Sequence, residues 1–352
     1  MKCNLMVKRL ALVSMVMASG ASAQTAHLTS SDVEGHNGEP LNRFGISYRA
    51  GFNISAKFKN VGGYKSPLNR DPVTGAAQYD DGYIGVDPSG NLGNETQAWG
   101  YTSGAQYQGD AIVMSSSGSP ANGATKNQYD DPQHGVEFTY NRQLGLMDKT
   151  KWGIEAAFNY TDVTMNDRGT VFGDVNKARY AYALGGNVPP PAPYSYKPGY
   201  FPAPLLSTIP SQLPSVTVPG GATTTGSRNF DADIFGLRVG PYFEFPMSER
   251  FSFLLSGGLS LLVVSSDFKY HQTTSIEGLP SQSQSGSGSH SDVLGGSYVG
   301  GNIVYALSKS VSLSVGAQYQ ANGHYQQVED GQKAQIDLGQ SYFLTVGLGY
   351  SF

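Results

Sequence analysis

The chain has 352 residues, of which 45 are Gly and 22 are Tyr, and charged residues make up only 14% of it. Its formal net charge of −4 gives no indication of nucleic-acid binding. After the N-terminal segment there is no run of 18 apolar residues, so the sequence predicts no transmembrane helix there. The single cysteine, Cys3, rules out an internal disulfide.

The N-terminal segment has the order of a secretory signal peptide. Basic residues open it, the apolar stretch 10–18 follows, and small residues stand at Ala21 and Ala23. This order predicts a signal peptide over residues 1–23, with cleavage after Ala23. Residues 24–41 are then expected to form a periplasmic N-terminal lead. Metal binding is the alternative for this lead, because it carries His27, Asp32, Glu34 and His36.

Eight segments alternate apolar and polar residues, which is the pattern of strands with one apolar face. In the first segment Phe44, Ile46 and Tyr48 share one face, and Ser47 and Arg49 share the other. The sixth segment is the weakest, because both of its faces mix Gly with Val, Tyr and Ile. In chain order the segments are residues 44–58, 134–144, 151–165, 228–245, 250–268, 292–307, 310–320 and 341–352.

The connections between these segments alternate in length. Links of a few residues join segments two and three, four and five, and six and seven, whereas four long loops cover about 59–133, 166–227, 269–291 and 321–339. Short turns on one side and long loops on the other are typical of transmembrane barrels. The sequence therefore predicts an all-β fold, a transmembrane antiparallel up-and-down β-barrel over residues 42–352.

Closure of this barrel follows from the membrane. Lipid cannot satisfy an open sheet edge, so the last strand is expected to pair with the first. The segment 341–352, SYFLTVGLGYSF, fits this role, because large apolar residues alternate in it with small ones. Eight strands place both termini and all short turns on one side. A ten-stranded barrel is the alternative, with a hairpin of residues 81–87 and 98–114 added to the ring.

The signal peptide, the loop rhythm and the terminal GLGYSF resemble the small eight-stranded outer-membrane barrels of Gram-negative bacteria, such as the transmembrane domain of outer-membrane protein A and the opacity proteins. The resemblance implies a barrel in contact with outer-membrane lipid and lipopolysaccharide, with extracellular loops and periplasmic termini. It also implies that the barrel-insertion machinery reads Tyr350 and Phe352. The chain departs from outer-membrane protein A in lacking a peptidoglycan-binding domain after the barrel and in its longer first and second loops.

The inward faces of the predicted strands carry six charged residues: Arg49, Lys57, Glu137, Glu155, Arg238 and Glu244. An unpaired charge inside a narrow barrel is costly. We therefore expect Arg49 and Arg238 to bridge to Glu137 and Glu155 and to plug the lumen. A polar path for small solutes is the alternative.

Other candidate chemistry has a plainer interpretation. His134, His271 and His324 fall near outer strand ends, with Asp131, Asp267 and Ser275 near two of them, but no motif of a lipid-modifying enzyme surrounds them. The stretch 79–95 is similar to a calcium loop, but Leu92 stands where that loop needs Gly. Its interpretation is a turn-rich loop. We predict no catalytic residues, no metal and no cofactor.

Two further stretches are expected to be irregular. The Pro-rich segment 187–221 is predicted to run as polyproline II or as irregular cover, and the low-complexity segment 281–291 is predicted to be flexible. The sequence favours a non-enzymatic outer-membrane protein with a structural or surface-interaction role, whose long loops contact an extracellular ligand that the sequence does not name. A narrow channel for small solutes is the first alternative, and a lipid-modifying enzyme is the second.

Overall fold

The computed structural model describes residues 41–91, 93–198 and 204–352. Apart from a 3₁₀ turn at Gly104–Gln106, the secondary structure of these residues consists of strands, so the all-β prediction is confirmed. Among the described residues, no helix is long and apolar enough to cross a membrane. The predicted signal peptide, with Ala21 and Ala23, and residues 24–40 of the predicted lead lie outside this range.

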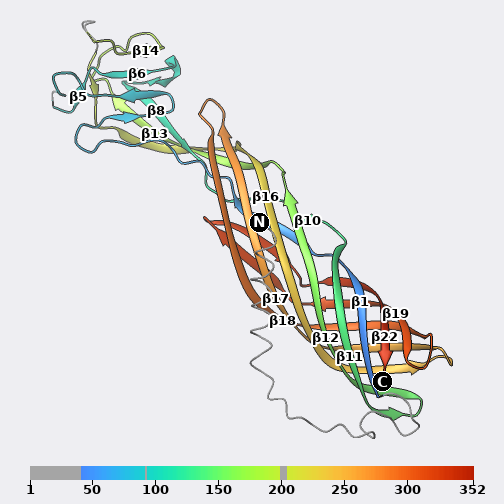
Figure 1. Cartoon of the computed structure of the whole chain (residues 1–352). Coiled ribbons are helices and arrows are strands. Elements are labelled where there is room, and N and C mark those ends of the chain that lie inside the picture. The colour runs from blue at the N-terminus through green and yellow to red at the C-terminus, as the bar shows by residue number, and fades with distance from the viewer. Residues whose placement is uncertain (1–40, 92, 199–203) are drawn as a thin grey trace.

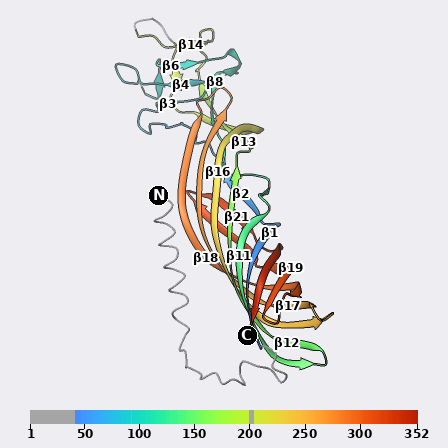
Figure 2. The ribbon, with the colours of Figure 1, turned by 45° about the vertical axis from the view of Figure 1, so that its right-hand side comes forward.

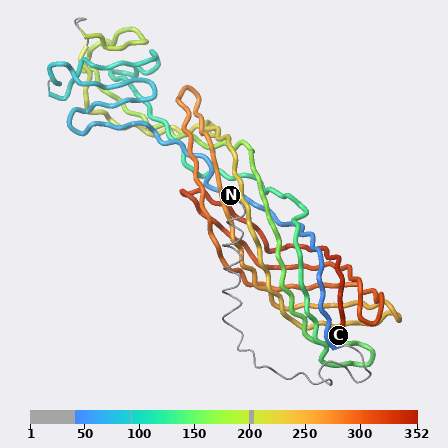
Figure 3. The backbone as a smooth tube through the Cα atoms, in the orientation of Figure 1, coloured from blue at the N-terminus to red at the C-terminus, as the bar shows by residue number. Residues whose placement is uncertain are grey.

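Eight strands pair into a closed antiparallel ring within the described residues (Figures 1 and 3). The order around the ring is β12, β11, β1, β22, β19, β18, β17, β16, and the pairing of β16 with β12 closes it. The strands are β1 (Asn42–Phe52), β11 (Gln133–Met147), β12 (Thr150–Asp167), β16 (Ser211–Pro246), β17 (Phe251–Ile276), β18 (Gln282–Ala306), β19 (Val311–Ala321) and β22 (Ser341–Ser351).

The first and last strands of the ring form a regular seam. Ten residue pairs join β1 to β22, from Arg43 opposite Ser351 to Phe52 opposite Tyr342. At its end, the backbone N–H of Asn42 donates to the carbonyl of Phe352 over 3.1 Å, and the N–H of Phe352 donates back over 2.9 Å. The ring therefore has no free edge at the seam.

The long strands of the ring change the polarity of their outward face part of the way along, and β12, β16 and β17 change that of their inward face as well. On β17 the outward residues are apolar from Phe251 to Val263 and polar from Ser265 onward. The inward residues change the other way, but less strictly. In the ring Ser256 and Ser260 are buried beside the apolar Leu254, and from Leu262 onward the buried apolar residues Val264, Phe268 and Tyr270 alternate with the polar Ser266, Gln272 and Thr274. We call this exchange the face inversion.

The face inversion recurs at the same level on the neighbouring strands. On β16 the outward apolar run ends at Phe235, which pairs with Val263 of β17, and Asp233 and Asp231 follow it. On β12 the outward run ends at Tyr160, opposite Phe235, and Asp162 follows. The ring thus has an apolar outer belt, and the strands that continue beyond it form a wall with a polar outer face and an apolar inner face.

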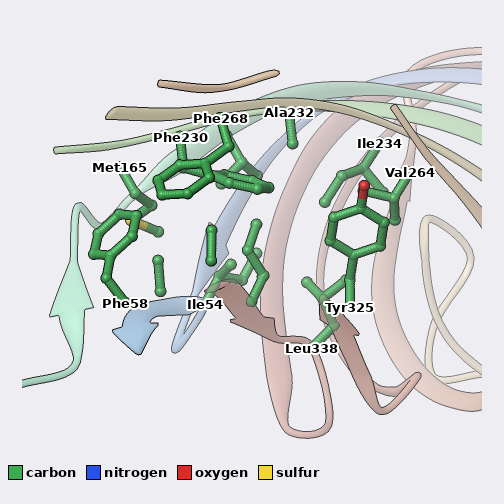
Figure 4. Close-up of a cluster of buried hydrophobic side chains, with 14 of the residues drawn as sticks. Ile54, Phe58, Met165, Phe230, Ala232, Ile234, Val264, Phe268, Tyr325 and Leu338 are labelled. Atoms are coloured by element: carbon green, nitrogen blue, oxygen red, sulfur yellow. The ribbon is translucent and has the colours of Figure 1, made fainter. Parts of the chain in front are cut away.

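A small inner sheet covers the apolar inner face of this wall. It consists of β10 (Gln128–Tyr129), β2 (Ser55–Val61), β21 (Gln332–Asp337) and β20 (His324–Glu329), with β9 (Gly123–Ala124) beside β2. Figure 4 shows the cluster that joins the two layers, in which Phe58 stacks on Phe268 at 5.6 Å and Tyr325 meets Phe230 edge-on at 6.2 Å. We call this cluster the junction core.

Beyond the junction core the chain forms a separate unit, the head, at the end of the molecule opposite Phe352 (Figures 1 and 2). The head has its own core, which includes Trp99, Tyr101, Ile112, Met114 and Tyr182. Its strands are β3 (Ala77–Gln78), β4 (Gly82–Ile84), β5 (Glu95–Thr96), β6 (Trp99–Tyr101), β7 (Tyr107–Gln108), β8 (Ala111–Gly118), β13 (Val171–Ala183), β14 (Tyr194–Ser195) and β15 (Leu206–Ser207).

The hairpin considered for a ten-stranded ring belongs to the head instead. Strand β4 pairs with β6 in a four-stranded sheet that is separate from the ring. Strand β8, which follows in the same stretch, pairs with β13, and β13 pairs with β16, so these strands of the head also continue the sheet of the wall. Neither contributes a strand to the closed ring of the described residues.

Two expectations of irregular structure are wrong in part or in full. Of the Pro-rich segment 187–221, the described residues before Ser211 form only the two-residue strands β14 and β15, but 211–221 is the start of β16, although it contains Pro214 and Pro219. The pairing of β16 with β17 begins only at Ala222, so this stretch pairs on one side alone, with β13, and prolines are tolerated on such an edge. The Ser- and Gly-rich stretch 282–291 is the start of β18, held by continuous pairing with β17 from Gln282.

Candidate functional site

Four of the six predicted lumen charges meet in one buried network. Arg238 lies between two carboxylates: its Nη2 is 2.8 Å from Oε1 of Glu137 and its Nη1 is 3.3 Å from Oε1 of Glu155. The second oxygen of Glu137 lies 3.3 Å from Nη1 of Arg49. All four side chains are at most 5% exposed, and their formal charges cancel. Because a buried charge needs a partner, this neutral set is the stable arrangement.

Packing and hydrogen bonds hold the network in place. The guanidinium of Arg49 lies over the ring of Phe343 at 3.7 Å, and that of Arg238 lies over Tyr298 at 4.3 Å. Asn141 donates from Nδ2 to Glu155 over 3.0 Å. Arg238 is therefore held by two carboxylates and an aromatic face, and Arg49 by one carboxylate and an aromatic face.

The remaining two predicted lumen residues lie elsewhere. Glu244 is near the end of the ring away from the head, where it forms a two-pronged pair with Arg43 at 3.0 and 3.3 Å and accepts a hydrogen bond from Ser252. Lys57 lies in β2, in the inner sheet above the ring, because the first predicted strand breaks at residues 53–54 and its second half leaves the ring.

Little open space lies along the lumen. A cavity of about 60 Å³ lies beside Glu137, Glu155 and Arg238, which is room for a few water molecules. A second cavity, of about 10 Å³, lies between Arg49 and Leu338 at the base of the junction core. The charge network and the junction core thus fill the interior at two successive levels.

The candidate catalytic histidines lie on three different strands, β11, β17 and β20. His134 Nδ1 is 2.5 Å from the hydroxyl of Tyr48, and His324 Nδ1 is 3.1 Å from Oδ1 of Asp337. Asp131 accepts a hydrogen bond from the backbone of Asn53. Within the described ranges, no group of three or more His, Cys, Asp or Glu residues could hold a metal ion.

In the stretch 79–95, which is similar to a calcium loop, the carboxylate of Asp87 accepts hydrogen bonds from groups of the same loop. Oδ1 of Asp87 accepts from Oγ1 of Thr96 at 3.1 Å and from the N–H groups of Gln97 and Ala98 at 2.9 and 3.0 Å. The side chain of Asn91 accepts from the N–H of Asp87. This is the geometry of a side chain that shapes a turn.

The head carries a cavity of about 830 Å³, much larger than either cavity in the lumen. Four tyrosines line this cavity, and we call it the tyrosine pocket. The tyrosines are Tyr83, Tyr101, Tyr194 and Tyr196, and the polar lining residues are Gln78, Asp80, Thr102, Ser195 and Lys197. Its walls come from the stretch 78–102 and from 190–197, which are far apart in the chain.

Strand pairing brings these two stretches together. Strand β14 pairs with β6, with Tyr194 opposite Tyr101 and Ser195 opposite Gly100, and the N–H of Tyr196 donates to the carbonyl of Trp99 over 3.1 Å. Gly100 is required here, because a Cβ at this position would lie 2.5 Å from the ring of Tyr83 and 2.8 Å from the carbonyl of Tyr194.

Burial governs the ionisation of the head. It raises the pKa of Tyr101 and of Tyr194, the latter helped by Tyr83, so these phenols remain neutral at physiological pH. Burial also raises the pKa of the Asp81 carboxyl, although that carboxyl accepts a hydrogen bond from the N–H of Ser115. Tyr101 and Tyr194 therefore present neutral hydroxyl groups in the tyrosine pocket.

Several of these residues were not predicted from the sequence patterns. Arg43 has the same parity as Arg49 on β1, so the alternation that placed Arg49 inside could have placed Arg43 there too. The buried pair of Arg228 and Asp167, 2.6 Å apart beside the junction core, was also missed: Arg228 opens the expected strand 228–245, and Asp167 lies two residues beyond the expected strand 151–165. The tyrosines of the pocket carry no local signal, because their proximity depends on the pairing of β14 with β6.

A closed antiparallel ring with an apolar outer belt and a polar interior is the architecture of outer-membrane β-barrels. No protein-family model and no curated protein matches the chain. Among solved structures, the chain is similar to the attachment invasion locus protein Ail of Yersinia pestis, with 11% identity and a TM-score of 0.25 over 88% of this chain and 97% of that one.

Two further solved outer-membrane proteins are similar to the chain. The outer-membrane protease OmpT of Escherichia coli is 9% identical, with a TM-score of 0.31 over 88% of this chain and 97% of that one. The outer-membrane protein OprG of Pseudomonas aeruginosa is 11% identical, with a TM-score of 0.30 over 89% and 97%. The chain resembles these outer-membrane proteins, and at such TM-scores the likeness carries no argument about function.

Proposed function

We propose that this protein is a closed, non-enzymatic outer-membrane barrel that holds a folded head outside the cell and acts through surface interactions of that head. One observation carries the proposal: the head has an aromatic core and a pocket of its own, at the end of a wall that rises from the ring. A protein whose task was confined to the membrane would not need this unit.

The apolar belt supports an eight-stranded transmembrane barrel. The outward run from Phe251 to Val263, at about 3.3 Å per residue and a tilt of about 45°, covers about 30 Å, the thickness of the hydrocarbon core. The face inversion then marks the outer limit of the lipid. The inner sheet and head are extracellular, and the short turns and both termini are periplasmic. Tyr350 and Phe352, on the outward face, serve as the signal for insertion.

Contact with lipopolysaccharide is expected at the level of the face inversion. There the outward residues change within one or two positions from apolar to polar on each long strand, for example from Val263 to Ser265. A barrel surface of this kind has its apolar part in acyl chains and its polar part among sugar headgroups.

The channel alternative is disfavoured by the filled interior. A path for solutes would have to cross the charge network and then the junction core, and the cavities beside them hold about 60 and 10 Å³. The enzyme alternative is disfavoured because the three candidate histidines lie on separate strands and hold no shared nucleophile-and-base geometry among the residues described.

Two measurements on the full chain test the proposal. In a Cys3→Ser background, a cysteine at Ser89 in the head should react with an impermeant maleimide on intact cells, whereas one at Ser308 in a short turn should react only after lysis. Reconstituted in planar bilayers, the protein should show no steady conductance. Labelling at Ser308 on intact cells would reverse the topology, and steady nanosiemens steps would establish the channel in its place.

A further inference from the structure

We propose that the tyrosine pocket of the head binds a neutral oligosaccharide. This inference rests on the proposed surface role of the head and names the ligand class for it. The pocket has the volume of a small-molecule site, about 830 Å³, and its walls are held by strand pairing and side-chain hydrogen bonds.

A site for an oligosaccharide first requires aromatic side-chain faces, and the tyrosine pocket supplies them in fixed positions. Tyr194 packs against Trp99 with ring centroids 4.8 Å apart and against Tyr101 at 6.5 Å. The hydroxyl of Tyr83 is 3.0 Å from Oγ of Ser195, and the hydroxyl of Tyr101 donates to the carbonyl of Pro190. Rigid tyrosine rings give a large contact area with little loss of side-chain entropy, and they suit the apolar C–H face of a sugar ring.

A hydrogen-bond acceptor is the second requirement, and the carboxylate of Asp80, which lines the pocket, supplies it. Its Oδ1 has no accessible surface, so the ligand hydroxyl would donate to the other oxygen of this carboxylate. Oε1 of Gln78 is a further acceptor beside it, because the amide nitrogen of Gln78 is directed to the carbonyls of Tyr79 and Gly82.

The charges around the pocket favour a neutral ligand over an ionic one. Asp80 and Lys197 both line it, so one negative and one positive group offset each other. A site for a cation would present aromatic faces and carboxylates without a nearby ammonium group, and a site for a sulfated or phosphorylated sugar would present several basic groups. The combination of tyrosine rings, one carboxylate, one ammonium group and hydroxyl-bearing side chains matches a ligand rich in hydroxyl groups.

The experiment uses the full chain in lipid nanodiscs and fluorescein-labelled probes. Maltotetraose, chitotetraose and lacto-N-tetraose are the neutral probes. A heparin tetrasaccharide and a trimethyllysine peptide are the anionic and cationic probes. Fluorescence anisotropy should show saturable binding of at least one neutral probe, at least tenfold tighter than either charged probe. Absence of saturable binding of all three neutral probes, or tighter binding of a charged one, would overturn the inference.

Variants then locate the site. Tyr196→Ala and Asp80→Asn should each weaken binding at least tenfold, while Tyr196→Phe, which keeps the ring, should bind within threefold of wild type. Tyr107→Ala is the matched control, because Tyr107 is an exposed head tyrosine outside the pocket, and it should bind like wild type. Equal binding by all four variants would place the saccharide elsewhere.

The readouts separate this inference from the proposed function. The labelling of Ser89→Cys and the conductance measurement do not depend on the pocket. A protein that is closed and displays its head but binds no neutral probe would retain the surface role and lose only the ligand class. In a Trp152→Phe background, an unchanged fluorescence spectrum of Trp99 in each variant would show that the variant keeps the fold of the head.

Discussion

Arg238 donates from Nη2 to Oε1 of Glu137 over 2.8 Å, and both side chains are buried inside the ring. This contact joins β16 to β11 over the inner face of β12, because the two strands lie on either side of β12 in the ring. The pair thus links ring strands that share no backbone hydrogen bonds, and it makes the stability of the ring depend on side chains as well as on strand pairing.

Arg238→Ala should lower the free energy of unfolding by about 3–5 kcal/mol, because it leaves Glu137 and Glu155 buried without their shared partner. Arg43→Ala is the control: the pair of Arg43 and Glu244 is more exposed, so its loss should cost less. Urea unfolding in micelles measures both. An equal cost for the two variants would contradict the special role of the network.

The same Arg238→Ala variant should remain electrically silent in planar bilayers. The junction core above the network does not depend on Arg238, and its aromatic contacts, such as that of Phe58 with Phe268, stay in place. A variant that conducts would show that the charge network is the sole barrier.

The face inversion can be tested with one substitution on each side of it. Val299→Arg puts a charge on the outward apolar face of β18, opposite Gly257 near the middle of the belt, and should cost about 2–4 kcal/mol in a bilayer. Ser287→Arg lies on the same face of the same strand beyond the inversion, opposite Lys269, and should change stability little. Unfolding from liposomes compares them, and a similar cost for both would move the lipid boundary.

Phe58→Ala should destabilise the junction core by about 3–5 kcal/mol, because Phe58 is fully buried and its removal leaves a cavity. The matched control is Phe172→Ala, an exposed phenylalanine at the start of β13, which should be nearly neutral. Limited proteolysis on intact cells gives a second readout. The inner sheet should become cleavable in Phe58→Ala while the ring survives, and an unchanged digest would show that the inner sheet does not rely on this core.

The head should show opposite pH dependence at two carboxyls. Burial raises the pKa of Asp81, so its contribution to stability is present below the unfolded value of about 3.9 and is lost as pH rises through the folded pKa. The backbone N–H groups of Thr74 and Val73 lower the pKa of Asp71, so its contribution is present above the unfolded value and is lost as pH falls through the folded pKa.

Asp81→Asn should therefore make the head more stable relative to wild type at pH 7 than at pH 4, and Asp71→Asn should have the opposite trend. In a Trp152→Phe background, the fluorescence of the buried Trp99 follows unfolding of the head alone. A difference between Asp81→Asn and wild type that is the same at both pH values would mean that this carboxyl does not titrate between them.

Alternation along the chain was enough to predict the strands of the ring and much of its interior. In β1 the spacing of Phe44, Ile46 and Tyr48 fixes an outward face, so Arg49 must point inward. The same parity on β11, β12 and β16 places Glu137, Glu155 and Arg238 inside. Since a closed ring has one lumen, residues of that parity and similar height were bound to be neighbours.

The parts beyond the apolar belt could not be predicted in this way. Residues 282–291 form a strand with no apolar face, so their order comes from pairing with β17, which no local pattern reports. Strands β20 and β21 lie in a stretch expected to be a loop, and their apolar side chains have a place only because β16 and β17 extend beyond the belt. The tyrosine pocket joins residues about 100 positions apart, such as Tyr83 and Ser195.

The face inversion also bears on how accurately the strands must align. If β17 slipped by one residue against β16, its belt segment would turn Leu259 and Leu261 into the lumen, and its upper segment would turn Phe268 out into water. The slip would thus be unfavourable in both halves of the strand: the belt segment would lose its apolar contact with lipid, and the upper segment would lose its packing in the junction core. Lipid contact and the junction core therefore restrict the register of β17 together, and more strictly than a membrane barrel or a water-soluble sheet would alone.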